Sequence, residues 1–226
     1  MANIHAGWSA AQVRAAEQTL LHAGEPLMQR AAAGLAAEIE GILSGQGSRP
    51  GAVLVLAGSG NNGGDALFAA ARVAERGYRV TLVPLAARLH EEALAAALQA
   101  GAVRAASAEP DAVAALARDA DVIVDGILGT GAAASPALRT PAREVVSAAH
   151  AAGSAAAVVA VDLPSGLSPD DGQVFVPLLR ADVTVTFGAV KAGLLLEPGA
   201  SAAGRVVLVD IGLGPYLQGE PLVPPA

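Results

Sequence analysis

The sequence has no cysteine among its 226 residues, which excludes disulfide bonds, a thiolate nucleophile and zinc sites built on cysteine. Aromatic residues make up only 3% of the chain, and the formal net charge is −7. Proteins that bind nucleic acid usually carry a basic face or aromatic side chains on which bases stack. Because the chain has neither feature and its arginines are scattered, we expect no nucleic-acid partner.

Long apolar runs are also missing. Hydrophobic residues reach 53% and the mean hydropathy is +0.48, but the excess is alanine and valine. The chain has no uninterrupted apolar stretch of about 18 residues, the length that a membrane-spanning helix needs. The residues before Trp8 do not combine a basic stretch with an apolar core, so a signal peptide is not expected. We therefore expect a cytoplasmic protein without membrane association.

Lysine and asparagine are scarce as well. The chain has one lysine, Lys191, and three asparagines, of which Asn61 and Asn62 are adjacent. The adjacent pair lies in the segment Gly58–Ala66, which reads GSGNNGGDA and follows an apolar run. Two amides among four glycines indicate a backbone wrapped around a small polar ligand. For Lys191 we favour a functional amine, and a solvated surface lysine is the alternative.

The rest of the chain alternates between short apolar runs and segments with helical spacing. Two helices are expected first, at Ser9–Ala23 with Ser9 as N-cap and at Leu27–Leu43 after Pro26. Short Val- and Leu-rich runs separated by helices are typical of a parallel sheet covered on both faces. Strands are expected at 52–57, 79–83, 121–127, 156–163, 182–187 and 205–211. Further helices are expected at 65–76, 91–100, 110–118 and 141–152.

These elements predict an α/β fold. The expected architecture is a three-layer αβα, Rossmann-like domain with a mainly parallel central sheet and two N-terminal helices. The length suits one such domain, which we assign to residues 1–218. Residues 219–226 are proline-rich and are expected to be a tail or the start of a linker.

Polar clusters follow four of the predicted strands. Because the carboxyl ends of parallel strands share one edge, and ligands of such sheets bind at that edge, we expect one pocket built from four loops. The four clusters are Gly58–Asp65, Asp125–Ser135, Asp162–Ser168 and Gly188–Lys191.

The glycine loop matches the dinucleotide-binding pattern only in part. Gly58, Gly60 and Gly63 satisfy the spacing G-x-G-x-x-G, which alone is a weak signal. The pattern also requires an acid about 20 residues later to hold a ribose hydroxyl. The second predicted strand and the turn after it contain no acidic residue before Glu91. Ordinary NAD binding by an oxidoreductase is therefore disfavoured.

The same loop also fails as a phosphate-binding P-loop. Gly64-Asp65 stands where that motif needs lysine followed by serine or threonine, so a nucleotide triphosphatase is not expected. Two structural alternatives stay open for the loop. Asp65 could serve only as a helix cap, and the two asparagines could serve only to form the turn.

A catalytic triad and a histidine metal site are not expected either. Ser165 does not lie in the Gly-x-Ser-x-Gly motif of nucleophilic serines. Histidines are expected only in helical or terminal segments away from the four loops. They are His5, His22, His90 and His150.

Taken together, these motifs resemble the NAD(P)H-hydrate epimerase family, of the YjeF N-terminal type. The resemblance covers nearly the whole chain, and the combination of Asn-Asn-Gly-Gly-Asp at 61–65 with Asp-Leu-Pro-Ser-Gly at 162–166 is specific. Further matching motifs are Trp8-Ser-x-x-Gln-Val-Arg-x-x-Glu17, Leu27-Met-x-x-Ala31, Asp125-Gly-x-x-Gly-Thr-Gly131, Ala181-Asp-x-Thr-x-Thr-Phe187, Lys191-Ala-Gly193 and Gly204-Arg-Val-Val.

The resemblance implies an isomerase. Such enzymes interconvert the R and S forms of NADH and NADPH hydrated at C6, collectively NAD(P)HX. They supply the S form to an ADP- or ATP-dependent NAD(P)HX dehydratase, which is often fused at the C-terminal side. A homodimer with one potassium ion in each subunit is also implied. Two alternatives are kept, namely a non-catalytic binding or scaffold module and, less favoured, an NAD-dependent oxidoreductase.

The resemblance also assigns site residues. Potassium would be held by oxygens of Asn62, Asp125 and Ser165, which are donors that suit a hard cation. Asp162 would stabilise the cation formed when hydroxide leaves C6, and Lys191 would protonate or hold the departing hydroxyl. The substrate site would comprise Asn61, Asn62, Gly63, Gly64, Asp65, Gly129, Thr130, Gly131, Ala132, Ala133, Ala134, Ser135 and Asp162.

Two positions depart from the family pattern without removing a predicted ligand. Ala66 replaces a usual glycine, and Ser168 stands where aspartate is common. The residues at 132–135 are smaller than those that the family often carries there.

Overall fold

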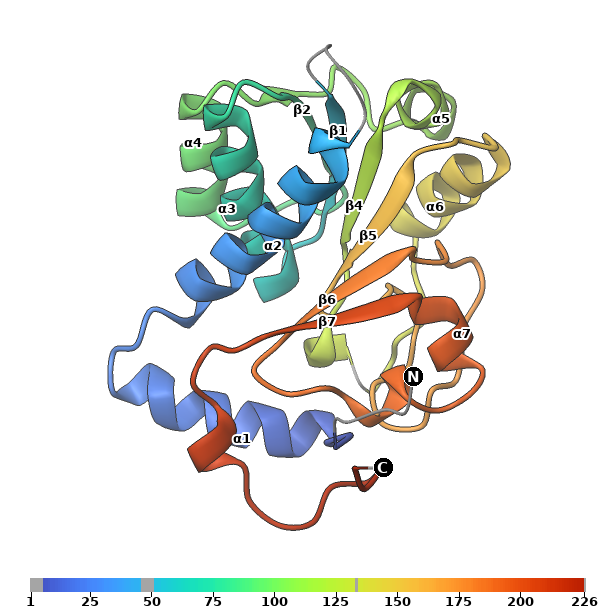
Figure 1. Cartoon of the computed structure of the whole chain (residues 1–226). Coiled ribbons are helices and arrows are strands. Elements are labelled where there is room, and N and C mark those ends of the chain that lie inside the picture. The colour runs from blue at the N-terminus through green and yellow to red at the C-terminus, as the bar shows by residue number, and fades with distance from the viewer. Residues whose placement is uncertain (1–5, 46–50, 133, 226) are drawn as a thin grey trace.

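A computed structural model describes residues 6–45, 51–132 and 134–225 of the chain. His5 and Ala133, both named above, lie outside the described residues. Within them, seven strands form one sheet in the order β3-β2-β1-β4-β5-β6-β7, and every neighbouring pair is parallel (Figure 1). The strands are β1 (Ala52–Ala57), β2 (Arg79–Pro84), β3 (Val103–Arg104), β4 (Val122–Gly126), β5 (Ala157–Val161), β6 (Val183–Phe187) and β7 (Arg205–Val209).

Helices cover both faces of the sheet, so the predicted three-layer α/β fold is confirmed. In Figure 1, α2, α3 and α4 lie on one side of the strands and α5 and α6 on the other. The helices are α1 (Ala10–His22), α2 (Leu27–Ser44), α3 (Asn61–Glu75), α4 (Glu91–Gln99), α5 (Pro110–Asp119), α6 (Ala142–Ala151) and α7 (Gly199–Ala203). Short 3-10 turns are η1 (Thr130–Ala132), η2 (Ala192–Leu194) and η3 (Gly214–Tyr216).

The side chains of β1 alternate between the two faces of the sheet and contribute to the core on both. Val53 and Val55 pack with residues of α2, α3 and α4, whereas Leu54 and Leu56 pack with residues of α5 and α6. Successive side chains of a strand point to opposite faces, so a run of apolar residues belongs to a strand buried on both sides. This is the reason why uninterrupted Val/Leu runs predicted the central strands correctly.

The two N-terminal helices begin close to where the sequence places them. Ser9 caps α1: its hydroxyl accepts the backbone N–H of Gln12, and the Gln12 side chain accepts the backbone N–H of Ser9. Pro26 directly precedes α2 at the N-cap position. Backbone hydrogen bonds from Trp8 to Val190 and from Ala192 to Trp8 then tie the entry of α1 to the Lys191 segment.

The start of α3 was predicted wrongly. The glycine loop was expected to continue to Asp65, but α3 already begins at Asn61 with Gly60 as its N-cap. Two short elements were also missed, the two-residue strand β3 and the five-residue helix α7. Both are too short to display a period in the sequence.

The strand order reverses between β1 and β4, which makes this the topological switch point of the sheet. Gly58, just after β1, donates its backbone N–H to the carbonyl of Gly126 at the end of β4, at 3.0 Å. In open parallel sheets, ligands bind in the crevice at such a point, at the carboxyl ends of the strands. The two glycine-rich loops after β1 and β4 therefore lie where a ligand is expected.

The last described residues pack against the N-terminal region. Gly7 and Val223 exchange two backbone hydrogen bonds, of 2.8 and 3.1 Å, and the Gln12 amide donates to the carbonyls of Gln218 and Glu220. Residues 219–225 thus contact α1 and the segment before it. The proposed boundary at residue 218 stays a prediction.

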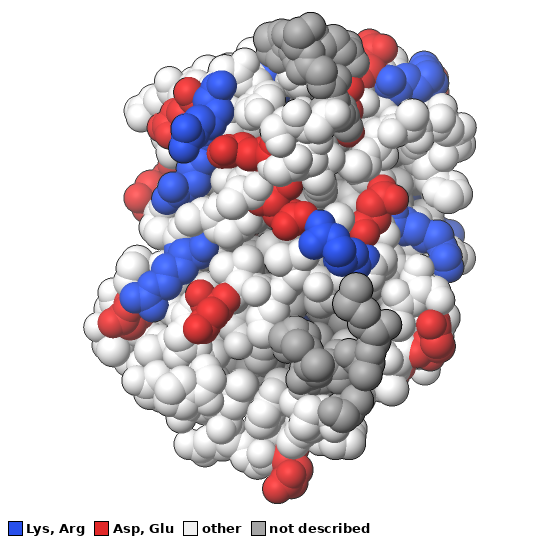
Figure 2. All heavy atoms as spheres, in the orientation of Figure 1, with Lys and Arg blue, Asp and Glu red and all other residues white. Residues whose placement is uncertain are grey.

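On the face seen in Figure 2, basic and acidic side chains are interspersed among uncharged residues, and the described part of this face has no continuous basic patch. None of the helices within the described residues has both the length and the apolar character that crossing a bilayer would require.

Candidate functional site

The Asn62 side chain joins three of the four predicted loops. Its Nδ2 donates to the carbonyl of Leu128 at 3.1 Å and to the carbonyl of Val161, at the end of β5. Gly129 lies against the same side chain, because a Cβ atom built on Gly129 would fall 2.0 Å from Oδ1 of Asn62. The loops after β1, β4 and β5 therefore meet around one buried amide.

Asp125 and Ser165 form a second connection beside it. The Ser165 hydroxyl donates to Oδ1 of Asp125 at 2.6 Å, and the Ser165 backbone N–H donates to Oδ2 at 2.8 Å. The same hydroxyl accepts the backbone N–H of Leu128 at 2.9 Å. Burial raises the pKa of Asp125, and the hydrogen bonds from Ser165 oppose that shift. The carboxylate is thus held in place at the end of β4.

Asp162 and Lys191 form a buried ion pair where the fourth loop joins the others. The Lys191 ammonium contacts Oδ1 of Asp162, and it also donates to Oγ1 of Thr186 at 3.1 Å and to the carbonyl of Phe187 at 3.0 Å. Oγ1 of Thr186 in turn donates to Oδ1 of Asp162 at 3.0 Å. The convergence of all four loops, expected from the strand order, is confirmed by these contacts.

The backbone of Asp162 is unusual. Its φ is 64°, and among the described residues it is the one non-glycine residue with a positive φ. Its N–H donates to the carbonyl of Val185 at 2.8 Å, which fixes the turn against β6. A left-handed aspartate is tolerated but costs free energy, and such strain is typical of functional turns.

Lys191 is not a surface residue, so the solvated-lysine alternative is wrong. It is 1% exposed, and it does not line the cavities described below. Its ammonium lies behind Asp162, whose hydrogen bonds in the described structure go to Oδ1. The second oxygen of Asp162 is therefore the one available to the pocket, and Lys191 can act through it.

A narrow pocket of about 90 Å³ lies in front of Asp162. Predicted site residues on its wall are Asn61, Asn62, Asp65, Thr130 and Asp162. Apolar side chains complete it, namely Leu21, Leu27, Met28, Ala31, Phe187 and Ile211. A small pocket lined equally by apolar side chains and convergent polar groups suits a flat ring.

Asp65 faces this pocket rather than capping a helix, so the capping alternative is wrong. It is the fifth residue of α3 and is 6% exposed, and no hydrogen bond to its carboxyl group occurs in the described structure. Burial raises the pKa of Asp65 well above its ordinary value, and the nearby carboxyl groups of Asp162 and Glu17 raise it further. Lys191 acts in the opposite direction.

Two wider cavities continue from this pocket along the sheet edge. One of about 420 Å³ shares Asn61, Asn62 and Thr130 with the narrow pocket and adds Gly129, Gly131 and Ala132. The next, of about 330 Å³, shares Ala132 with it and reaches Ser135. The three cavities follow one another past the ends of β5, β4 and β1. They offer room for an extended ligand that has its ring in the narrow pocket.

Some predicted substrate residues do not line these cavities. A Cβ atom on Gly63 would lie 2.0 Å from the carbonyl oxygen of Gly58, and Gly64 packs against Met28 and His90. These two glycines allow α3 to approach its neighbours closely. Ala134 is exposed outside the cavities, and Ala133 lies outside the described residues.

The histidines were expected to lie away from the four loops, and this expectation is wrong for His90. Its ring packs against Gly64 and lies edge-on to Phe68, with ring centroids 5.6 Å apart. Its Nδ1 accepts the backbone N–H of Ala93, so it also caps α4. Within the described residues, no group of three or more His, Asp or Glu side chains is placed to hold a metal ion.

Sequence reasoning missed Glu17 and Arg14 as site residues. Both come from α1: Glu17 lines the narrow pocket and the cavity beside it, and Arg14 donates to the carbonyl of Thr130 at 2.7 Å. A signal was present, because Glu17 lies four residues after buried Val13 and three before buried Leu20, on the packed side of the helix. A carboxylate in such a position calls for a specific partner or a function.

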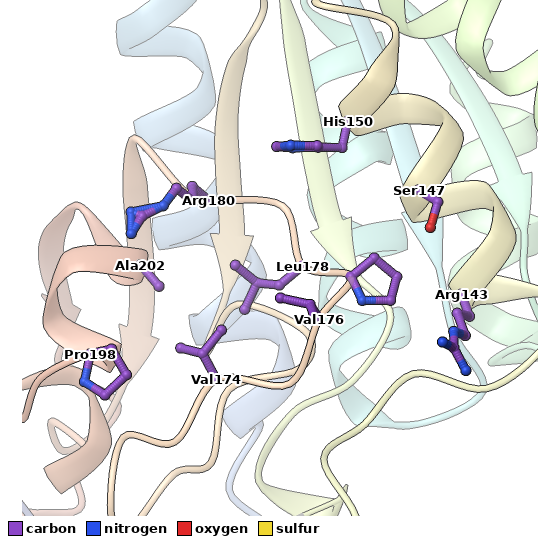
Figure 3. Close-up of a pocket in the computed structure, with 10 residues that line it drawn as sticks. Arg143, Ser147, His150, Val174, Val176, Leu178, Arg180, Pro198 and Ala202 are labelled. Atoms are coloured by element: carbon purple, nitrogen blue, oxygen red, sulfur yellow. The ribbon is translucent and has the colours of Figure 1, made fainter.

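The widest of the described cavities lies elsewhere. It has about 570 Å³ and opens between α6 and the segment 174–180 (Figure 3). Its charged side chains, Arg143 and Arg180, are exposed, and its other walls are largely apolar. No predicted site residue lines it, so size alone does not identify the functional site here.

Replacing Asp65 with asparagine is expected to make the fold more stable at neutral and higher pH. The folded protein favours protonated Asp65, so this group contributes stability that is present below the ordinary aspartate pKa and is lost as pH rises through the raised pKa. Asparagine does not ionise, so it removes that loss. Each tenfold difference in proton affinity between the folded and the unfolded chain changes the free energy of unfolding by about 1.4 kcal/mol. Denaturant unfolding at pH 5 and pH 8 measures the difference.

The exposed Asp111 of α5 provides the matched control, and Asp111→Asn should show no comparable gain at pH 8. An Asp65→Asn variant that loses stability equally at both pH values would contradict the raised pKa that burial gives the Asp65 carboxyl group.

Comparison with known proteins shows the family of this chain. The family described as YjeF-related protein N-terminus matches residues 24–193. The chain is 51% identical over 217 residues to an NAD(P)H-hydrate epimerase of Microbacterium testaceum, covering 94% of this chain and 81% of that one. It is 50% identical over 213 residues to an NAD(P)H-hydrate epimerase of Clavibacter michiganensis, covering 92% and 90%.

Longer proteins and a solved structure are similar as well. A bifunctional NAD(P)H-hydrate repair enzyme Nnr of Mycobacterium tuberculosis is 41% identical over 217 residues, which are 91% of this chain and 41% of that protein. The crystal structure of the yeast protein ynu0, YNL200c, superposes with a TM-score of 0.72 at 21% identity, covering 83% of this chain and 82% of that one. At this low identity, the similarity to the yeast protein shows only a shared fold.

Proposed function

The chain belongs to the YjeF-related protein N-terminal family, and we propose that it is an NAD(P)H-hydrate epimerase, an isomerase that interconverts the R and S hydrates of NADH and NADPH. The observation that carries the proposal is the carboxylate of Asp162, held by Lys191 at the wall of a narrow pocket where four loops meet. Two relatives named NAD(P)H-hydrate epimerase are about half identical to this chain, and the match covers most of the length of each.

Epimerisation at C6 requires that one bond to this carbon break and form again. The ring nitrogen can supply electrons as hydroxide leaves, so the ring becomes a cation that water attacks from either face. The ionised carboxylate of Asp162, at the wall of the pocket, would stabilise that cation. The apolar side chains that form half of the wall limit competing water.

Lys191 would support this chemistry through Asp162. Its ammonium has three acceptors, Oδ1 of Asp162, Oγ1 of Thr186 and the carbonyl of Phe187, and all are buried. The ion pair keeps one carboxylate oxygen in place and leaves the other for the ring. A role of Lys191 in protonating the departing hydroxyl directly would require its ammonium to leave these three acceptors and reach the pocket.

We propose a potassium ion as the cofactor, held by Asn62, Asp125 and Ser165. The three side chains are grouped around Leu128, whose carbonyl accepts the Asn62 amide and whose N–H donates to the Ser165 hydroxyl that is bonded to Asp125, so the group offers amide, carboxylate and hydroxyl oxygens within a short reach of one another. Oxygen donors of this kind with one negative charge suit a hard monovalent cation. Bound potassium would add positive charge beside the glycine loops, where a dinucleotide carries its phosphates.

Removing potassium is therefore expected to lower both stability and activity. A ligand that binds only the folded state stabilises it by about 2.7 kcal/mol at 100 times its Kd. The measurement compares the unfolding midpoint and the epimerisation rate in potassium chloride and in choline chloride of equal ionic strength. Asp125→Asn should abolish the difference between the two salts. Equal midpoints and rates in the two salts for the wild type would contradict the proposed cofactor.

We further propose that the epimerase supplies an NAD(P)HX dehydratase. The bifunctional relatives, of which this chain matches less than half the length, are consistent with such a partnership. A homodimer and a cytoplasmic location stay predictions from the resemblance.

A coupled assay tests the proposal against its two alternatives. Pure R hydrate is mixed with a dehydratase specific for the S form, and the recovery of NADH absorbance is followed. An epimerase raises the recovery rate far above the spontaneous rate in proportion to its concentration. A scaffold module leaves the rate unchanged, and an oxidoreductase is revealed by turnover of NAD with an added alcohol or acid substrate.

A further inference from the structure

The narrow pocket contains more carboxyl groups than the mechanism above uses. Glu17, Asp65 and Asp162 all line it, and only Asp162 is paired, with Lys191. Within the described residues, Glu17 and Asp65 have no side-chain hydrogen bond or ion pair, and none of their carboxyl oxygens is both fully buried and unpartnered, so these oxygens reach the pocket. Asp65 is only 6% exposed, with nothing but the pocket to interact with, so a ligand with polar atoms is expected against these two acids.

These acids approach the pocket from different sides. Asp162 follows β5 and belongs to the edge of the sheet, whereas Glu17 belongs to α1, which lies across the carboxyl ends of the strands (Figure 1). The helix is fixed there by the Arg14 contact to Thr130 and by the backbone pairing of Trp8 beside Lys191. A flat ring in the pocket would therefore meet Asp162 from the sheet and Glu17 from the covering helix.

The electrostatics of the pocket raise the pKa of the carboxyl group on this covering side. Burial raises the pKa of Glu17; Asp162 raises it further, and Lys191 and Arg14 oppose the shift. The neighbouring carboxyl group of Asp65, whose pKa is also raised, adds to the preference for protonated acids. The site thus combines a carboxyl group paired with Lys191 with two carboxyl groups whose pKa values are raised.

We propose that Glu17 is a second catalytic acid–base residue, which serves the face of the nicotinamide ring opposite to the face served by Asp162. The inference rests on the proposed epimerase activity and deepens it. An enzyme that inverts a hydroxyl-bearing carbon needs a proton donor on the face where water leaves and a proton acceptor on the face where water enters.

The proposed step balances without any further reagent. Protonated Glu17 gives its proton to the C6 hydroxyl, the C6–O bond breaks, and its electron pair leaves with water. The lone pair of N1 forms a double bond to C6. A water molecule on the opposite face then bonds to C6 through its oxygen, the electron pair of the N1–C6 double bond returns to N1 as its lone pair, and the bound water passes one proton to Asp162. The reverse sequence converts the other epimer, with the two carboxyl groups exchanging roles.

The test uses the full chain with Glu17→Gln and water labelled with oxygen-18. Inversion between R and S hydrates is expected to fall about 10²–10⁴-fold, the usual contribution of one acid–base group. The epimer whose hydroxyl faces Asp162 should still exchange its C6 oxygen with labelled water, because its donor and acceptor are intact. The other epimer should neither exchange nor invert. Chromatography separates the epimers, and mass spectrometry reads the label.

Glu75→Gln is the matched control, since Glu75 is exposed at the far end of α3 and should leave both rates unchanged. Glu17→Ala serves as the second variant, and thermal unfolding establishes that each variant is folded. Inversion by Glu17→Gln at the wild-type rate overturns the inference, and so does equal loss of label exchange in both epimers. If the wild type itself does not invert either hydrate, the proposed function fails instead.

Discussion

Asp162→Asn is expected to lower kcat for epimerisation by about 10²–10⁴-fold while NAD(P)H-like ligands still bind. Asparagine keeps the shape of the side chain but removes the negative charge that stabilises the ring cation. The change also leaves the Lys191 ammonium buried without its counter-ion, which costs about 3–5 kcal/mol of stability. Activity and unfolding must therefore be measured together.

A double variant separates the two effects. Asp162→Asn combined with Lys191→Met removes both buried charges, so we expect stability to recover while activity stays low. Thr186→Val is the milder control, because it removes one hydrogen bond to Asp162 and keeps the carboxylate. Full activity of the Asp162→Asn variant would show that this carboxylate is not the catalytic group.

Gly129→Ala is expected to reduce activity by about 10²-fold and to destabilise the fold. A methyl group on Gly129 would fall 2.0 Å from the Asn62 amide oxygen, so the amide must move. Asn62 holds the loops after β4 and β5 together, and misplacing catalytic groups by about 1 Å can cost this much in rate. Overpacking of a buried contact adds about 1–3 kcal/mol of destabilisation.

Gly131, two residues further along the same loop, provides the comparison. A methyl group on Gly131 would meet nothing within 4 Å, so Gly131→Ala should keep the wild-type unfolding midpoint. If Gly129→Ala and Gly131→Ala unfolded at the same temperature, this result would contradict the claim that the contact between Gly129 and Asn62 leaves no room for a methyl group.

Much of the fold could be predicted because its signals are local. Runs such as 52–57 are apolar on both faces, and the polar residues after them mark the carboxyl ends of the strands. Parallel strands can share only one such edge, so the meeting of the loops at Asn62, Asp125 and Asp162 followed from topology. The order of the motifs along the chain thus carried three-dimensional information.

Other features depend on tertiary contacts that the sequence does not display. Gly63 and Gly64 are poor helix formers, so the first turn of α3 was expected to be a loop. In the fold, the Gly58 carbonyl lies too close to Gly63 for a Cβ atom, and Gly64 packs tightly against Met28 and His90. The burial of Lys191 and the approach of Glu17 to the pocket depend equally on how α1 is placed over the sheet edge.

One measurement tests the central proposal most directly. Pure R and pure S hydrates of NADH are incubated separately with the wild-type protein, and the epimer ratio is followed by chromatography. We predict that both samples reach the same ratio, at rates proportional to enzyme concentration and far above those in buffer. Rates equal to those in buffer, from both starting epimers and with potassium present, would contradict the proposal that this protein is an NAD(P)H-hydrate epimerase.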